Sequence, residues 1–164
     1  YLYPRPGELR QAEWAELNLS KAEWTIPAAR TEMRREHRKP LPTQAVSILR
    51  GLHKLNGDGR LVFPSVKTRL RPISENTLNG ALRRLGYATN EATARGFRAS
   101  ASSLLNESGL WSPDAIEAEL AHVGADDVRR AYHRAIYWDV RVKMAAWWAD
   151  QIDAMRVPKM DVFG

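Results

Sequence analysis

The spacing of apolar residues near the start of the chain predicts one helix followed by a small sheet. Residues 8–16 place their apolar side chains on one side of a helix. Residues 15–19, 23–28 and 37–41 are instead short runs with β-forming residues, separated by polar, turn-like segments. Pro40 stands near the end of the third run, where an edge strand tolerates proline. The three runs predict a small three-stranded antiparallel sheet.

The apolar period becomes helical after this sheet. Thr43 is a candidate N-cap for a helix that stops at the turn-forming residues 56–59, and a short extended piece follows at 62–64. The same spacing predicts further helices over residues 74–85, 94–107 and 113–121, from 126 or 127 onwards, and over 137–155. The predicted fold class is therefore mainly α, of the α+β type, with one minor sheet.

Length and composition favour one domain that contains no disulfide. A chain of 164 residues is long enough to bury a core of its own. The absence of cysteine excludes disulfides and Cys-ligated zinc and agrees with a reducing cytosol. No apolar run approaches the length of a membrane-spanning helix, and no signal peptide opens the chain. Because the chain begins without Met, we expect it to be a fragment whose N-terminal part is missing.

The net charge of +6, with a pI of about 9.9, favours a polyanionic partner. Residues 30–60 hold eight bases and three acids, a net charge of 8 − 3 = +5, whereas residues 99–164 hold seven bases and ten acids, a net charge of 7 − 10 = −3. This asymmetry predicts one face for nucleic acid and another for packing or a protein partner. Arginines that merely decorate solvated helices are the alternative.

Tyr132 is a candidate nucleophile in the last third of the chain. A phenol has a pKa of about 10, so it attacks poorly unless its surroundings favour the phenolate. Arg129 lies three residues earlier and would share a helix face with Tyr132. The alternative is an ordinary half-buried tyrosine on an amphipathic helix.

Arg5, Arg98 and His122 are candidate ligands of a phosphate group. A guanidinium is planar and always protonated, which suits the charge that spreads over the equatorial oxygens during phosphoryl transfer. Both arginines are predicted beside a helix N-terminus, which also favours an anion. His122 would donate to a phosphate oxygen or handle the proton of the nucleophile. The alternatives are surface ion pairs for the arginines and a helix cap for the histidine.

No metal site is predicted. His37, His53 and His133 are scattered along the chain without the spacing of metal ligands. The acidic pair Asp126-Asp127 is typical of a helix cap and not of a two-metal site.

The order of these segments resembles the phage-type integrases, which are tyrosine recombinases, from about residue 5 to residue 155. The matching stretches are Arg-Pro-Gly-Glu-Leu-Arg at 5–10, Trp-Thr-Ile-Pro-Ala at 24–28, Arg-Arg-Glu-His at 34–37, Gly-Phe-Arg-Ala-Ser-Ala-Ser-Ser-Leu-Leu-Asn-Glu at 96–107, Leu-Ala-His at 120–122 and Ala-Tyr at 131–132. The resemblance implies a helical catalytic domain with a small three-stranded sheet over residues 1–155, followed by a tail at 156–164 and lacking the family's N-terminal DNA-binding part.

The resemblance also implies a role for each matched residue. Arg5 and Arg98 correspond to the first and second catalytic arginines, His122 to the histidine of the third box, and Tyr132 to the nucleophile. Glu8 corresponds to the acid that steadies the arginines. The implied reaction is metal-free DNA strand exchange through a 3′-phosphotyrosyl intermediate, with no cofactor. The implied partners are double-stranded DNA and further copies of the protein in a tetramer, at the nucleoid of a bacterial cytoplasm.

Two positions depart from the family pattern. Arg95 stands where the family has a histidine, and Glu32 stands where it has the lysine that protonates the leaving 5′-oxygen. The cations nearby are Arg34, Arg35 and Lys39, which we expect to bind DNA; Lys39 would replace the missing lysine only if this loop folds differently. The alternative function is therefore a catalytically impaired DNA-binding relic of a prophage integrase. A helical protein-binding module and a type IB topoisomerase are further alternatives.

The predicted terminal helix is unusually apolar. Its large apolar side chains are Trp138, Met144, Trp147, Trp148 and Ile152. They would either complete the core of the domain or dock onto a neighbouring subunit, with the tail at 156–164 flexible or exchanged.

Overall fold

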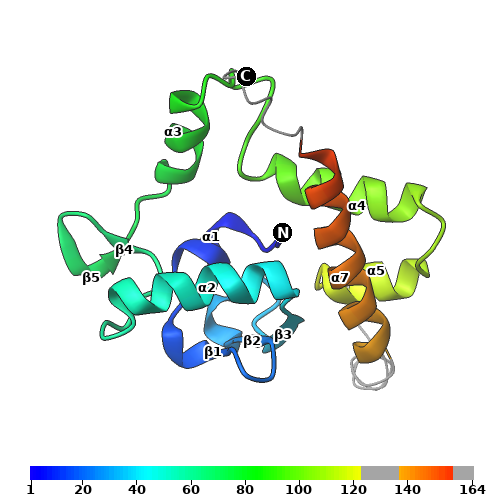
Figure 1. The fold of residues 1–164 in the computed structure, drawn as a ribbon, viewed down its shortest axis with the longest axis horizontal. Coiled ribbons are helices and arrows are strands. Elements are labelled where there is room, and N and C mark those ends of the chain that lie inside the picture. Colours follow the sequence, from blue (N-terminus) through cyan, green and yellow to red (C-terminus); the bar gives the residue numbers. More distant parts are fainter. Residues whose placement is uncertain (123–136, 157–164) are drawn as a thin grey trace, which may run out of the picture.

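The computed structural model describes residues 1–122 and 137–156, and its fold is mainly helical with a small antiparallel sheet, as predicted (Figure 1). The elements are α1 (Pro6–Arg10), η1 (Trp14–Glu16), β1 (Leu17–Asn18), β2 (Glu23–Ile26), η2 (Ala28–Arg30), β3 (His37–Pro40), α2 (Thr43–Asn56), β4 (Pro64–Ser65), β5 (Thr68–Pro72), α3 (Thr77–Arg84), α4 (Gly96–Glu107), α5 (Pro113–Glu119) and α7 (Trp138–Met155). None of the helices within the described residues is long and apolar enough to cross a membrane.

The three-stranded sheet has the order β1-β2-β3, and both strand pairs are antiparallel. The third strand lies at an edge and ends at Pro40, which confirms the prediction for this proline. In the β2–β3 register, Trp24 lies opposite Lys39 and Ile26 lies opposite His37. All four of these side chains are buried, so one face of the sheet is covered along its whole length.

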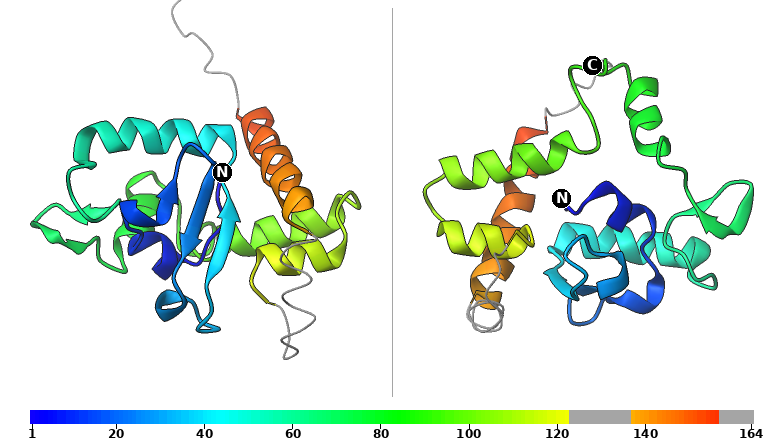
Figure 2. Two further views of the ribbon diagram at one scale, coloured as in Figure 1. Left: turned by 90° about the horizontal axis from the view of Figure 1, so that it is seen from below. Right: turned by 180° about the vertical axis from the view of Figure 1, so that it is seen from behind.

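The buried side chains form two clusters. One cluster joins the sheet to α2 and comprises Ala12, Trp24, Ile26, Leu41, Val46, Leu49 and Val62. The other joins α4, α5 and α7 and comprises Tyr3, Ala101, Leu105, Ile116, Leu120, Met144 and Trp148. Tyr3 comes from the N-terminal segment, so the start of the chain lies between the two groups of elements. The two groups also meet where α7 lies beside β3 (Figure 2).

The first predicted helix is much shorter in the structure than the range 8–16. Helix α1 ends at Arg10, and the chain then crosses the segment 60–62 in an extended conformation. The backbone N–H of Trp14 donates to the carbonyl oxygen of Arg60 (3.0 Å), and the backbone N–H of Val62 donates to that of Ala12 (2.9 Å). This long-range pairing buries Ala12 and Val62, which outweighs the local helical spacing.

Most of the other predicted elements are present, several with shorter boundaries. Strand β1 begins after the turn η1, and β2 stops before Pro27, which the sequence pattern included. Thr43 lies inside α2 and does not cap it, because Pro42 holds the cap position in an extended conformation. The hairpin of β4 and β5 was not predicted, since its strands lack alternating apolar residues. The helix predicted from 126 or 127 and the tail from 157 onwards lie outside the described residues.

Helix α7 uses its large apolar side chains within the domain. Met144 and Trp148 are buried in the second cluster, where Trp148 packs edge-on against Tyr3 with 5.8 Å between ring centroids. Trp147 packs against Trp111 with 6.1 Å between centroids. Of the two interpretations of this helix, completion of the domain core is the one confirmed for these residues.

Candidate functional site

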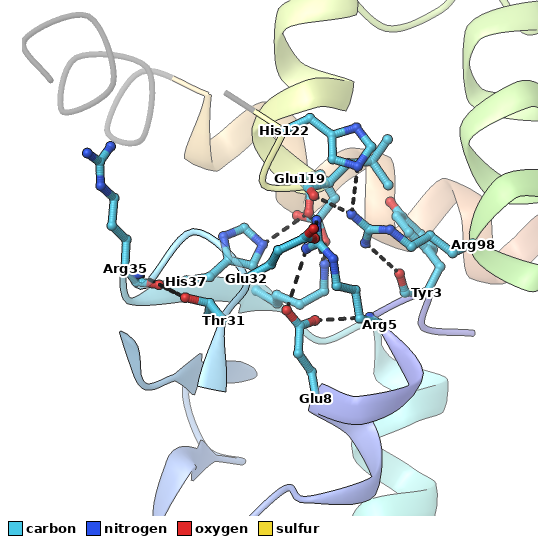
Figure 3. A network of polar contacts seen from close by, with 12 residues as sticks. Tyr3, Arg5, Glu8, Thr31, Glu32, Arg35, His37, Arg98, Glu119 and His122 are labelled. Atoms are coloured by element: carbon cyan, nitrogen blue, oxygen red, sulfur yellow. Dashed lines mark hydrogen bonds and ion pairs between the residues drawn. The ribbon is translucent and has the colours of Figure 1, made fainter. Parts of the chain in front are cut away.

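Three of the predicted site residues come from separate elements and meet at one place (Figure 3). Arg5 precedes α1, Arg98 lies in the first turn of α4, and His122 follows the end of α5. Arg98 Nη2 lies 3.2 Å from His122 Nε2, and Figure 3 shows the Arg5 side chain directed into the same region. The site is therefore assembled by tertiary contacts between segments far apart in the chain.

Glu8 fixes Arg5 at the start of α1. Its carboxylate accepts a hydrogen bond from the Arg5 backbone N–H (2.9 Å) and also faces the Arg5 side chain, with 3.6 Å between Oε1 and Nη1. Pro6 occupies the first helical position, where the missing N–H costs nothing. Because Glu8 itself is buried, it holds Arg5 from the protein side and leaves the outer edge of the guanidinium for another partner.

Arg98 is held by two backbone carbonyl groups. Its Nη1 donates to the carbonyl oxygen of Tyr3 (3.1 Å), and its Nη2 donates to the carbonyl oxygen of Leu120. Burial lowers the pKa of Arg98, the nearby Arg5 lowers it further, and Glu8 and Glu119 oppose this change. The reference pKa is high enough that the group stays cationic. Arg98 also lies in the first turn of α4, whose N-terminal dipole favours an anion.

His122 lies next to Arg98 in a defined orientation. The distance between Arg98 Nη2 and His122 Nε2 is 3.2 Å, and His122 Nδ1 lies 3.2 Å from Glu117 Oε2. A guanidinium can only donate, so Nε2 is the acceptor and the ring proton is assigned to Nδ1, facing Glu117. Arg5, Arg98 and His122 thus form a cationic and polar group at one place in the fold.

Glu32 reaches this group from the turn between β2 and β3. Thr31 closes the turn: its Oγ1 accepts from the backbone N–H of Arg35 (2.9 Å) and donates to the Arg35 carbonyl oxygen (2.6 Å). Glu32 Oε2 then lies 2.7 Å from Arg5 Nη2, while 67% of the Glu32 side chain remains exposed. The departure from the family pattern that the sequence indicated therefore lies at the site, where a carboxylate occupies one edge of Arg5 (Figure 3).

Arg95 occupies the N-cap position of α4, one helical turn before Arg98. Thr93 Oγ1 accepts from the backbone N–H of Gly96 (2.9 Å) and closes this helix end. Arg95 is exposed and forms no ion pair with any residue in 1–122 or 137–156. It adds positive charge at the edge of the site.

The three cations predicted to bind DNA differ in exposure. Arg34 is exposed at the tip of the turn, with a positive φ of 48°, and Arg35 is half-buried. Lys39 is 1% exposed, and its ammonium group contacts Glu119, so the prediction that Lys39 faces DNA is wrong. It cannot supply the missing lysine either, because the turn that carries Glu32 is formed and β3 directs Lys39 inward.

The residues that surround Lys39 were not predicted from the sequence. Glu119 is buried at the end of α5 and contacts Lys39 and Arg141, with 2.8 Å between Glu119 Oε2 and Arg141 Nε. Burial alone would raise the pKa of Glu119, but Lys39 and Arg141 hold this pKa below its usual value. His37 shares the inner face of β3, and burial, with Lys39 nearby, lowers its pKa to about 3. The period-two spacing of His37 and Lys39 was the available signal.

Tyr132 lies outside the described residues, so its predicted role as nucleophile stays a prediction. Within the described ranges, His, Asp and Glu side chains do not gather in groups of three that could hold a metal ion.

Comparison with known proteins identifies the class. Residues 4–137 match the model of the phage integrase family, and the chain belongs to this family. It is 42% identical to the integrase of Enterobacteria phage P4 over an alignment of 168 positions, gaps included, which covers 94% of this chain and 38% of that protein. It is 43% identical to the prophage integrase IntA of Escherichia coli (strain K12) over 150 residues, which cover 92% of this chain and 36% of that protein. The chain thus spans well under half the length of these relatives.

Proposed function

We propose that this chain is the catalytic domain of a site-specific DNA recombinase that cleaves and rejoins strands with Tyr132. The observation that supports this most directly is the meeting of Arg5, Arg98 and His122 on three separate elements. Two guanidinium groups can hydrogen-bond the non-bridging oxygens of one phosphate and stabilise the charge that develops there, with the His122 ring beside them. Membership of the phage integrase family supports the same reaction.

The proposed reaction is a transesterification. The Tyr132 hydroxyl gives its proton to water as its oxygen attacks phosphorus, a bond from phosphorus to tyrosine oxygen forms, and the bond to the 5′-oxygen breaks. The 5′-oxygen takes up a proton and leaves as a hydroxyl, while the 3′-phosphate stays linked to the protein. The free 5′-hydroxyl of the partner strand then attacks this link and releases Tyr132. The number of phosphodiester-type bonds is conserved, so the reaction needs no nucleotide cofactor.

Proton transfer to the leaving oxygen is the weak step in this scheme. The family lysine that performs it is replaced by Glu32, and Lys39 is buried away from the site. Glu32 also pairs with Arg5, so a DNA phosphate has to displace this carboxylate or share Arg5 with it. These contacts favour the second candidate function, a DNA-binding protein with much reduced cleavage. Loss of a general acid slows a reaction on the order of 10²–10⁴-fold.

We further propose that the protein acts on double-stranded DNA as a tetramer. Met144, Trp147, Trp148 and Ile152 of α7 pack in or against the domain core, so we take the segment 156–164 as the candidate for exchange between subunits. Sedimentation of the protein with and without a duplex would measure the assembly.

A nicked suicide duplex tests the main proposal. The duplex carries the end sequences of the genetic element that encodes the chain, and the nick lets the short product diffuse away and traps the covalent link. Wild type should form an adduct that survives denaturing electrophoresis, and Tyr132→Phe should form none. Adduct formation by Tyr132→Phe would exclude Tyr132 as the nucleophile. DNA binding without an adduct in wild type would favour the impaired, DNA-binding function.

A further inference from the structure

The end of helix α5 is held by a group of buried polar side chains that the proposed reaction does not use. Glu119, Lys39 and Arg141 are each almost completely buried, and they come from α5, β3 and α7. One oxygen of the Glu119 carboxylate contacts Lys39 Nζ, and the other accepts from Arg141 Nε at 2.8 Å. Arg141 Nη2 also donates to the carbonyl oxygen of Arg38 (2.5 Å), which ties α7 to β3.

The backbone of Glu119 is held as well as its side chain. Its carbonyl oxygen accepts from Lys39 Nζ at 3.1 Å and from His37 Nε2 at 3.0 Å. The carbonyl oxygen can only accept, so Nε2 of His37 carries the ring proton. Two other elements, β3 and α7, thus fix the last turn of a seven-residue helix whose local hydrogen bonds alone would leave its end free to fray.

The next residues of the chain belong to the proposed phosphate site. The carbonyl oxygen of Leu120 accepts from Arg98, Ala121 has a positive φ of 52°, and His122 then lies 3.2 Å from Arg98. A non-glycine residue in this left-handed conformation persists only where the structure on both sides holds it. Glu119 is therefore the fixed point on one side of the turn, and the pair of Arg98 and His122 is on the other (Figure 3).

We infer that Lys39, Glu119 and Arg141 are positioning residues, which set the place of Arg98 and His122 by clamping the end of α5 onto β3 and α7. We call these three residues the clamp, and only its role in DNA cleavage rests on the proposed function. The clamp itself is a statement about the ligand-free protein and is tested without DNA.

Lys39→Met is the most informative variant. It removes both contacts of the ammonium group but leaves Glu119 paired with Arg141, so no buried charge loses all its partners. If this variant does not fold, Arg141→Met takes its place, since it leaves the pair of Lys39 and Glu119. A double variant, His37→Leu with Lys39→Met, removes both donors to the Glu119 carbonyl oxygen.

The measurement is the rotation of the Arg98 guanidinium about its Cζ–Nε bond, observed by NMR of arginine side chains in the 164-residue chain. Two backbone carbonyls hold this group in wild type, so its Nη signals should be separate and slow to exchange. Arg98→Lys assigns these signals by removing them. Lys39→Met should speed the rotation by about fivefold, the factor that corresponds to one net hydrogen bond, and the double variant should speed it further.

Leu49→Ala is the matched control. It opens a cavity in the sheet cluster, far from the end of α5, and lowers stability without touching the clamp. Unchanged rotation in both clamp variants would overturn the inference, and so would equal loosening by Leu49→Ala or fast rotation in wild type.

A second measurement connects the clamp to DNA cleavage. At saturating suicide duplex, Lys39→Met should lower the single-turnover rate of adduct formation by about fivefold or more while DNA affinity stays within twofold. If wild type forms no adduct but the NMR result holds, the proposed reaction fails and the clamp stands. If wild type cleaves and neither readout changes in Lys39→Met, the clamp fails and the reaction stands.

Discussion

Glu119 and Glu32 both pair with cationic side chains, and their different surroundings give these two ion pairs opposite consequences. Glu119 is 3% exposed and contacts two cations from two other elements. Glu32 is 67% exposed and pairs with Arg5 from the tip of a turn. Water can replace the partner of Glu32 at little cost, whereas neither Glu119 nor its cations can turn to water. The buried pair therefore holds elements together, and the exposed pair competes with whatever binds Arg5.

Burial also decides which of the positively charged side chains can reach DNA. The turn and strand over residues 34–39 contain four basic side chains, but Lys39 points inward and belongs to the clamp. Counting charges along the sequence overestimates the DNA-facing charge of this segment. A phosphate-binding surface here depends on which side chains the sheet directs outward.

The same substitution at both glutamates should have very different effects on stability. Glu119→Gln leaves Lys39 and Arg141 buried against a neutral amide, so we expect a loss of about 3–5 kcal/mol in the free energy of unfolding. Glu32→Gln should change this free energy by less than about 1 kcal/mol, as is usual for an exposed ion pair. Urea unfolding followed by tryptophan fluorescence measures both. Equal losses would show that burial does not distinguish the two carboxylates.

Restoring the family pattern at the exposed carboxylate should produce the next largest effect. Glu32→Lys with Arg95→His removes the competitor of the phosphate at Arg5 and returns a general acid, so adduct formation should rise on the order of 10²–10³-fold. The suicide duplex measures the rate. Glu32→Gln alone is the control, because it removes the competing charge without adding an acid. A double variant no faster than this control would show that proton transfer to the leaving oxygen is not limiting.

How far the sequence predicts this molecule depends on the range of the interactions involved. Gly86 and Gly109 have positive φ values of 95° and 66°, and they end α3 and α4 close to where the apolar spacing places those ends. The extended crossing of residues 12–14 with 60–62 depends on a partner distant in sequence, so local spacing predicted a longer helix instead.

The site shows the same division. The meeting of Arg5, Arg98 and His122 was expected from the order of family motifs, since nothing in the local pattern brings three distant segments together. The inward orientation of Lys39 follows from strand alternation, but a lysine is rarely buried without a partner. That partner, Glu119, lies on another element and cannot be found from local spacing, so Lys39 was predicted at the surface.

Acid should weaken the buried region around His37. Burial, with Lys39 nearby, lowers the pKa of His37 to about 3 from 6.5, so in this interval the unfolded chain binds a proton that the folded chain excludes. The contribution of His37 is therefore complete above about pH 6.5 and falls with pH at up to about 1.4 kcal/mol per unit, reaching a loss of about 2 kcal/mol at pH 5. Urea unfolding from pH 7 to pH 5 measures the slope. His37→Gln keeps a donor for the Glu119 carbonyl and should remove this part of the slope.

The smallest effect is expected on the salt dependence of DNA binding, in which the exposed Arg34 should differ from the buried Lys39. Arg34 is exposed at the tip of the turn, and the proposed function gives it a phosphate contact. Arg34→Gln should weaken duplex binding severalfold and reduce the slope of log K against log salt concentration by about 0.9, the change for one phosphate. Lys39→Met removes the same formal charge from the same segment, yet this slope should stay unchanged, because the ammonium group faces Glu119. Fluorescence anisotropy of a labelled duplex at several salt concentrations gives both slopes. A reduced slope in Lys39→Met would mean that the end of β3 opens on DNA and that the clamp is released there.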